Sequence, residues 1–241
     1  MICPEHGEYE SKILNLPFLN ETRTSPCPQC GEIREKEYQA REIEVENKRK
    51  LSLINSFTAR SGVPSRFKNK VLNDLQLINS KQKSILKIIK GYLQILLKGT
   101  STCLIMCGKP GTGKTHIGCS IVMNLIKAGK ESRIITTSNL MRRVKSTYHK
   151  ESEETEDDVL IEYGSLYFLV IDEVGVQFGT ETEKLIFYEI INRRYDNLLP
   201  TVLISNLTPD ELVVFIGERA FDRFKEDNGV ILAFDWESYR K

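Results

Sequence analysis

The stretch GKPGTGKT, residues 108–115, constrains this chain more than any other part of its sequence. It follows the apolar run TCLIMC (102–107) and precedes a segment whose apolar residues recur at helical spacing up to Ala128. A glycine-rich loop in this position lets backbone N–H groups surround phosphate oxygens, and the N-terminus of the next helix adds partial positive charge. The sequence therefore predicts a buried strand, a phosphate-binding loop and a helix in direct succession.

We expect this loop to bind ATP, with a different task for each residue type. Glycines allow the backbone to approach the phosphates, Lys114 reaches the outer phosphates, and the Thr115 hydroxyl is a ligand for Mg²⁺. The expected nucleotide-binding set is Gly108, Lys109, Pro110, Gly111, Thr112, Gly113, Lys114, Thr115 and His116.

Two later apolar runs end in polar residues that suit the same chemistry. LYFLVIDE (166–173) ends in Asp172, expected to hold Mg²⁺, and Glu173, expected to orient or deprotonate the attacking water. ISN (204–206) places Asn206 at the carboxyl edge of a neighbouring strand, where such sheets bind ligands. The plainer alternatives are a strand that happens to end in two acids and an asparagine that only begins the turn before Thr208.

Developing charge on a transferred phosphoryl group needs a cation, often supplied by a neighbouring subunit. Arg219 and Arg223 lie one helical turn apart in GERAFDRF (217–224), and Arg240 lies in the terminal SYR. Arginines at these places are equally suited to structural salt bridges, so the residue pattern alone leaves both interpretations open.

Apolar runs alternate with helical patterns from residue 102 onward, which predicts an α/β fold with a parallel five-stranded sheet and helices on both faces. Ser138 is expected to cap a helix over 138–148, and the acidic stretch 151–158 is expected to form a loop. The expected strands are 102–107, 132–137, 166–172, 200–206 and 229–234, and further helices are expected at 83–99, 181–197, 208–216 and 217–224.

The N-terminal segment has a different composition and predicts a metal site. CPEH (3–6) and CPQC (27–30) supply Cys3, His6, Cys27 and Cys30, a set of three thiolates and one imidazole that fits tetrahedral zinc. A segment this poor in apolar residues can hardly fold without a metal. The alternative is four unrelated polar residues in a disordered tail.

Residues 32–57 carry mixed charges and no glycine or proline, so we expect one long helix, either solvated or docked on a partner. We expect a zinc knuckle and helical arm over 1–60 and an ATPase domain over 61–241. The chain of 241 residues has 34 basic and 33 acidic residues, so any nucleic-acid contact must come from a local patch. No run approaches 18 apolar residues and no signal sequence is evident, so we expect a cytoplasmic protein without membrane contact.

The phosphate loop, VIDE, ISN, GERxxDR and the closing FDWESYR together resemble the DnaC-type helicase loaders and, more loosely, the IstB-type transposition ATPases. Both belong to the AAA+ class, and the resemblance runs from about Phe57 to the C-terminus. It implies that Asn206 is the sensor 1 residue, Arg223 an arginine finger that acts on a neighbouring subunit, and Arg240 the sensor 2 arginine. Arg219 is implied as a partner of Arg223.

The same resemblance implies a helical insertion over about residues 142–162 that touches single-stranded DNA. Tyr148 matches an aromatic position that can stack on a base, and Thr180 matches a second DNA-facing position. Thr182 stands where the family has a further aromatic residue, which implies a weaker grip on DNA. Basic residues of the preceding helix can bind phosphates or form a plain solvated face: Arg142, Arg143 and Lys145.

The resemblance implies a loader that self-associates on ATP and single-stranded DNA and holds a hexameric DnaB-type replicative helicase through its N-terminal arm. The zinc knuckle is not part of the bacterial DnaC pattern, which suggests a phage or prophage relative. Three alternatives remain: an IstB-like helper of a transposase, a small-molecule kinase, and an adaptor that uses ATP only as a switch. Only the hydrolytic functions would require Glu173 and Arg223.

Overall fold

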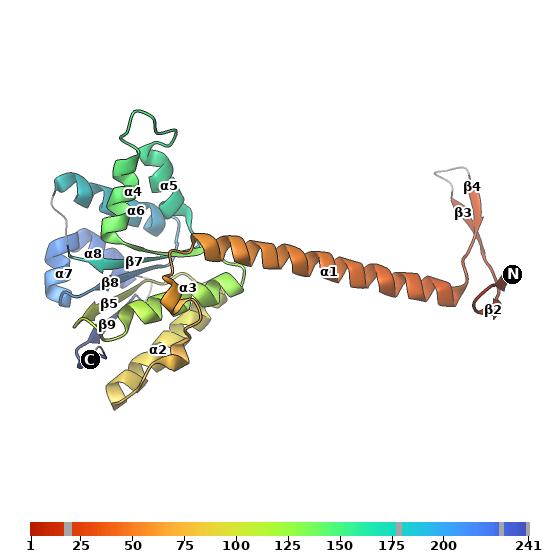
Figure 1. The fold of residues 1–241 in the computed structure, drawn as a ribbon, viewed down its shortest axis with the longest axis horizontal. Helices are drawn as coiled ribbons and strands as arrows, with labels where there is room; N and C mark the ends of the chain where they lie inside the picture. The colour runs from red at the N-terminus through yellow and green to blue at the C-terminus, as the bar shows by residue number, and fades with distance from the viewer. Residues whose placement is uncertain (17–20, 177–179, 227–228, 240–241) are drawn as a thin grey trace. The chain divides into compact units, whose positions relative to one another are not determined.

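The computed structural model of the chain describes residues 1–16, 21–176, 180–226 and 229–239 and divides into two compact units. The first unit comprises Met1–Leu53 and the second Ile54–Lys241 (Figure 1). Helix α1 (Pro28–Arg60) begins in the first unit and ends in the second.

The first unit is built from two short antiparallel hairpins and the beginning of α1. Strand β1 (Ile2–Cys3) pairs with β2 (Gly7–Glu8), and β3 (Ile13–Leu16) pairs with β4 (Glu21–Thr24). Among the side chains that the structure describes in this unit, only Cys3 and Cys27 are buried. Isolated two-stranded hairpins are marginal in water, and the described side chains of this unit form no apolar core that would stabilise it.

Helix α1 confirms the predicted long helix and extends it at both ends. None of its 33 residues is buried, and apolar side chains such as Ile43 and Leu51 are exposed along it. Its last turns differ, because Ile54 and Phe57 pack against the core of the second unit. Neither α1 nor any other helix in the described ranges is both long and apolar enough to cross a membrane.

The second unit contains the predicted five-stranded parallel sheet. Its strands follow the order β6-β7-β8-β5-β9, and each neighbouring pair is parallel. The phosphate-loop strand β5 therefore lies between the strands that carry the predicted Asn206 and the C-terminal tail. The strands are β5 (Leu104–Gly108), β6 (Ser132–Thr136), β7 (Phe168–Val174), β8 (Thr201–Ser205) and β9 (Val230–Phe234).

Alternate residues of each strand face two separate helical layers. Leu104 and Met106 of β5 join the core formed with α2 and α3, whereas Ile105 and Cys107 join the core formed with α4 to α8. Strands buried on both faces explain the near-continuous apolar runs in the sequence. The helices are α2 (Ser80–Leu97), α3 (Lys114–Lys127), α4 (Thr137–Ser146), α5 (Glu156–Ser165), α6 (Glu181–Asp196), α7 (Pro209–Ile216) and α8 (Glu218–Lys225).

Two local predictions require correction. Thr136, not Ser138, caps α4, because the Thr136 hydroxyl accepts the Asn139 N–H and the helix starts at the end of β6. The acidic stretch 151–158 is not all loop, because Thr155 forms a capping box with Asp158 and starts α5 at Glu156. Three acidic residues in the first turn of α5 are stabilised by the helix dipole. Thr208 caps α7, because its hydroxyl accepts the Glu211 N–H.

Arg194 on α6 is fully buried and joins the beginnings of two strands to the helices beside them. Its guanidinium donates to the carbonyl oxygens of Tyr163, Leu166 and Pro200 and to the Thr201 hydroxyl, at 2.8–2.9 Å. Burial lowers the pKa of Arg194 to about 9, so the group remains a cation at neutral pH. These hydrogen bonds stabilise the edge of the sheet that lies opposite the phosphate loop.

We expect Arg194→Ala to lower the free energy of unfolding by at least about 3 kcal/mol, because each buried carbonyl left without a donor costs roughly 1–3 kcal/mol. Chemical denaturation of the full chain measures this loss. The matched control is Arg193→Ala, which removes an exposed ion pair with Asp157 and should cost less than about 1 kcal/mol. Equal losses in the two variants would contradict the structural role of Arg194.

Candidate functional site

A cleft of about 400 Å³ opens at the carboxyl edge of the sheet, within the second unit. The phosphate loop, the end of β7 and the end of β8 all line it, as expected for parallel strands that end at one edge. The predicted residues that line the cleft are Pro110, Gly111, Thr112, Gly113, Lys114, Thr115, His116, Asp172, Glu173 and Asn206. Gly108 and Lys109 form the beginning of the same loop.

The backbone of the loop explains its glycines. Gly108, Gly111 and Gly113 have φ values of 118°, 75° and 98°, which side chains with a Cβ rarely adopt. A Cβ on Gly108 would also lie 2.4 Å from the Phe234 carbonyl oxygen. Gly113 is the N-cap of α3, so the first N–H groups of that helix face the cleft side of the loop, where they can bind phosphate.

Lys114 is the first residue of α3 and is nearly buried. Its ammonium group donates to the carbonyl oxygens of Gly108 at 2.6 Å and Lys109 at 2.7 Å. The cation is therefore held inside the curve of the loop, next to the position that phosphate oxygens would take.

Asp172 and Thr115 form a pair of oxygen ligands at the floor of the cleft. The Thr115 hydroxyl donates to Asp172 Oδ2 at 2.8 Å, which joins the phosphate loop to β7. Burial raises the pKa of Asp172, and hydrogen bonds from Thr115 and from the Glu173 N–H oppose that rise. Two adjacent oxygen ligands beside the phosphate loop fit Mg²⁺, which binds proteins through few ligands and keeps its remaining positions for water and phosphate.

Glu173 is exposed in the cleft and has a strained backbone. Its φ of 59° is unusual for a residue with a side chain, and the pairing of β7 with β8 is interrupted between Ile171 and Val174. A bulge of this kind re-aims side chains at functional sites. The interruption turns the Glu173 carboxylate toward the cleft instead of into a sheet face. Asn206 follows β8 directly, is exposed, and faces the same space.

Sequence reasoning missed one wall of the cleft, which comes from residues 67–76 and from the C-terminal tail. Phe67, Leu75, Gln76 and Tyr239 line this wall. The Tyr239 N–H donates to the Gly111 carbonyl at 2.9 Å, and its hydroxyl donates to the Gln76 carbonyl at 2.8 Å. FDWESYR was visible in the sequence as a motif, but nothing local showed that it crosses the phosphate loop.

The predicted arginines occupy different surroundings. Arg223 on α8 is not among the residues lining the cleft of its own chain; it donates to the Asn192 side chain and lies over the rings of Tyr188 and Tyr195, 5.4 and 4.9 Å from their centroids. Arg219 is exposed, with no ion pair in the part of the chain that the structure describes. Arg240 lies outside the described residues.

The structure groups the predicted DNA-binding residues at the ends of α4 and α6 but pairs most of them with acids. Lys145 forms an ion pair with Glu183, and Thr180 caps α6 by accepting the Glu183 N–H. Tyr148 is 55% exposed and donates to Glu156, which raises the pKa of Tyr148 to about 12. Arg143 pairs with Glu154 and Glu162, while Arg142 donates to Asn139 and Thr182 is exposed on α6.

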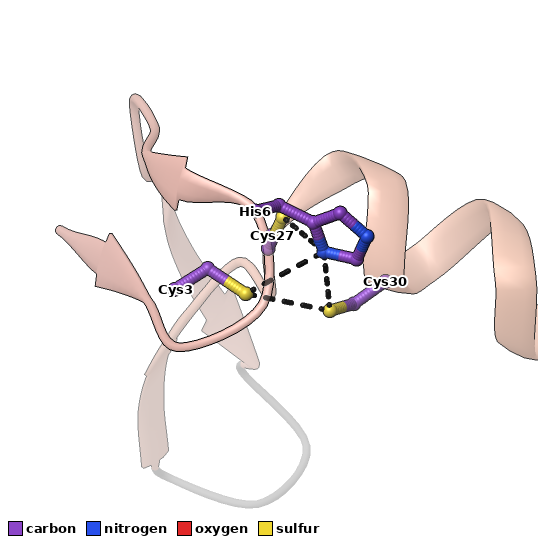
Figure 2. Close-up of side chains that lie close together, drawn as sticks. All are labelled: Cys3, His6, Cys27 and Cys30. Atoms are coloured by element: carbon purple, nitrogen blue, oxygen red, sulfur yellow. Dashed lines mark hydrogen bonds between the residues drawn. The ribbon is translucent and has the colours of Figure 1, made fainter.

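The four N-terminal metal-site candidates converge in the first unit (Figure 2). His6 Nδ1 lies 3.6, 3.9 and 3.3 Å from the sulfurs of Cys3, Cys27 and Cys30, and the Cys3 and Cys30 sulfurs are 3.5 Å apart. Bond lengths of about 2.3 Å for Zn–S and 2.0–2.1 Å for Zn–N place tetrahedral ligands roughly 3.5–3.8 Å from one another. The donor set and its spacing therefore fit a closed, structural zinc site.

The thiols of this cluster have unequal proton affinities. The backbone at Glu5 and the side chain of His6 lower the pKa of Cys3 to about 6, whereas the neighbouring Cys3 raises the pKa of Cys30 to about 11. A divalent cation that binds such a cluster displaces the protons of its thiols, because metal binding deprotonates coordinating thiols.

Comparisons with known proteins agree with the fold. Residues 42–240 match the family described as IstB-like ATP binding protein. The chain is 33% identical over 194 residues to the replicative helicase loader DnaC of Buchnera aphidicola subsp. Baizongia pistaciae, covering 80% of this chain and 78% of the relative. It is 32% identical over 198 residues to the protein of the same name from Escherichia coli K12, covering 82% and 79%.

A solved crystal structure of the DnaC helicase loader has the same fold, with a TM-score of 0.62 and 22% identity over 71% of this chain and all of that chain. The family match begins at residue 42, so all four zinc-site candidates precede the part of the chain that the family describes.

We expect the full chain to bind one zinc ion and Cys27→Ser to weaken binding by more than about 100-fold, because changes around a metal ligand alone cost 10–100-fold. Elemental analysis and competition with a chromogenic chelator measure this. Cys103→Ser, which changes a cysteine outside the cluster, is the control and should bind zinc as the unaltered chain does. One tightly bound zinc in Cys27→Ser would overturn the assignment.

Proposed function

The chain belongs to the family of IstB-like ATP-binding proteins, and from this premise we propose that it is an ATP-driven loader of a hexameric, DnaB-type replicative helicase. The observation that carries the proposal is its similarity, over about four fifths of its length, to proteins named replicative helicase loader. The cleft supports it further, because a loader that is reset by hydrolysis needs ATP and a water-activating group. Delivery onto single-stranded DNA is the output we propose.

ATP binds with its phosphates inside the loop, against the N-terminus of α3 and Lys114. Thr115 and Asp172 would hold Mg²⁺, which would neutralise charge on the outer phosphates. Glu173 accepts a proton from a water molecule that attacks the γ-phosphorus, and Asn206 positions that water or the γ-phosphate. The bond from the γ-phosphorus to the bridging oxygen breaks, and the products are ADP and inorganic phosphate.

The charge that develops on a transferred phosphoryl group needs stabilisation by cations, and Arg223 does not line the cleft of its own chain. We propose that Arg223 contacts the nucleotide of a neighbouring subunit instead. Next to α8, Val214 on α7 is 86% exposed and Leu185 on α6 is 55% exposed, and we propose that this surface takes part in self-association.

The first unit is the proposed contact with the helicase. Its zinc cluster would order a segment whose described side chains form no apolar core, and α1 carries exposed apolar residues among charges. Ile33, Tyr38, Ile43 and Val45 are all more than 40% exposed, so apolar side chains of this helix are available to a partner.

We expect Glu173→Gln to bind ATP normally but to hydrolyse it at least about 100-fold more slowly, because a positioned general base contributes 10²–10⁴-fold. Phosphate release and binding of a fluorescent ATP analogue measure the two effects. Glu181→Gln, which alters an exposed glutamate paired with Lys184, is the control. Normal helicase loading by the Glu173→Gln variant would instead favour the interpretation that the chain is an adaptor that uses ATP only as a switch.

We expect Arg223→Ala and Lys114→Ala each to lose ATPase activity by about 10³-fold or more, and mixtures of the two to regain part of it. A mixed assembly brings an intact Arg223 from one chain to an intact phosphate loop on the next. Arg223→Lys is the packing control, since it keeps a cation over Tyr188 and Tyr195. Mixtures that stay inactive would contradict catalysis between subunits.

We expect the full chain to form a stable complex with a DnaB-type hexamer in the presence of ATP, and deletion of residues 1–53 to abolish it. Light scattering after size-exclusion chromatography measures the mass of the complex. The deleted chain keeps the compact second unit and should still bind ATP, which controls for misfolding. Absence of a complex under every nucleotide condition would make a transposase helper the leading interpretation.

A further inference from the structure

One segment of the chain has a charge balance unlike the rest. Residues 61–100 contain eight lysines and arginines and a single acidic residue, Asp74, whereas the whole chain has 34 basic and 33 acidic residues. Most of this positive charge lies on α2, which has four lysines and no aspartate or glutamate, and on Lys98 directly after it. The nucleotide cleft does not use these residues, because none of them lines it.

Four of these lysines form one stripe along α2. Lys83, Lys87, Lys90 and Lys98 follow the i, i+4, i+7, i+15 spacing that places side chains on one helix face. All four are exposed, whereas Ile85, Ile89 and Leu96 of the opposite face are buried in the core of the second unit. At about 1.5 Å of rise per residue the stripe is roughly 22 Å long.

The four lysines have no ion-pair partner among the described residues. Lys81, outside the stripe, is the one lysine of α2 that is paired, with Asp235. An ordinary solvated helix face carries both signs, as α6 does with its glutamates, lysine and arginines. Like charges at i, i+4 destabilise a helix by a few tenths of a kcal/mol per pair, so this stripe lowers helix stability.

The contrast with the α4–α5 surface indicates what the stripe could bind. There, Arg143 and Lys145 already pair with glutamates, and six of the eight residues 151–158 are acidic. Phosphate groups approaching that surface must displace carboxylates, whereas phosphates approaching α2 meet lysines that have no competing anion. A nucleic-acid backbone is the anion that presents a regular line of charge over 22 Å.

We propose that the stripe of Lys83, Lys87, Lys90 and Lys98 on α2 binds the phosphate backbone of duplex DNA, as a second DNA contact separate from the single-strand surface. Single strands gain affinity by stacking bases on aromatic side chains, and the one aromatic residue of α2, Tyr92, is buried. The stripe therefore offers charge without stacking, which suits a duplex and carries no sequence preference. Its length matches about six base pairs at 3.4 Å each.

This contact would hold duplex DNA on the second unit, which also carries the proposed single-strand surface. The proposal goes beyond helicase loading and does not require it, because the stripe is a feature of the second unit alone. Binding of purified chain to DNA is measured without helicase, so failure to form a helicase complex leaves the result interpretable.

The test replaces all four lysines together by alanine and measures binding of the full chain to a fluorescently labelled 30-base-pair duplex at several salt concentrations. Alanine favours helix, and the four positions are exposed, so α2 should persist. The slope of log K against log salt concentration should become shallower by about 0.9 for each lysine that contacts a phosphate. Affinity at 0.1 M salt should fall at least about tenfold, while ATP turnover without DNA stays unchanged.

Two controls accompany the alanine variant. Replacing the same four lysines by arginine keeps the charge and should keep duplex binding. Replacing Lys184 and Lys225, exposed lysines that already pair with Glu181 and Asp222, by alanine should leave the salt slope unchanged.

Three outcomes would overturn the proposal. The first is an alanine variant with the affinity and salt slope of the unaltered chain. The second is loss of binding to a labelled single strand with duplex binding retained, which would assign the stripe to single strands. The third is binding of the unaltered chain to phosphatidylserine vesicles but not to the duplex, which would assign it to a membrane surface.

Discussion

The cleft depends on the parallel pairing of β5 with its two neighbours. Because β5 lies between β8 and β9, the phosphate loop leaves the sheet beside Asn206 on one side and beside the C-terminal tail on the other. The ladder continues past the strand, where the Lys109 N–H donates to the Phe234 carbonyl at 2.8 Å. That approach leaves no room for a Cβ on Gly108, so the loop's first glycine is required by the sheet as well as by phosphate.

A second constraint is that the proposed catalytic groups are held by hydrogen bonds between different elements. Thr115 on α3 and Asp172 on β7 are joined by a hydrogen bond, and the strained Glu173 follows directly. Burial favours the neutral form of Asp172, while a bound cation would favour the charged form. Binding of a nucleotide and its metal ion would therefore determine the charge states of these groups together.

The two units differ in what can stabilise their folded state. The second unit packs two apolar layers against a sheet, whereas the described side chains of the first unit bury only two cysteines. Four ligands within 4.8 Å of one another can replace an apolar core, because metal binding contributes folding free energy directly. The family match starts after this cluster, so the candidate metal site lies outside the part of the chain that the family describes.

The sequence alone determined the features that local chemistry specifies. The phosphate loop, the five strands, the acids near the end of β7 and the four zinc-site candidates were predictable because glycine spacing, apolar runs and ligand spacing act over a few residues.

Tertiary structure decided the rest. Phe67 and Tyr239 reach the cleft only through the packing of 67–76 and the tail on the loop. Arg223 lies over Tyr188 and Tyr195 and does not line its own cleft. Lys145 and Lys87 look alike in the sequence, yet one meets Glu183 and the other meets no acid among the described residues. Strand order and long-range packing set these distances, and a chain's local pattern does not encode them residue by residue.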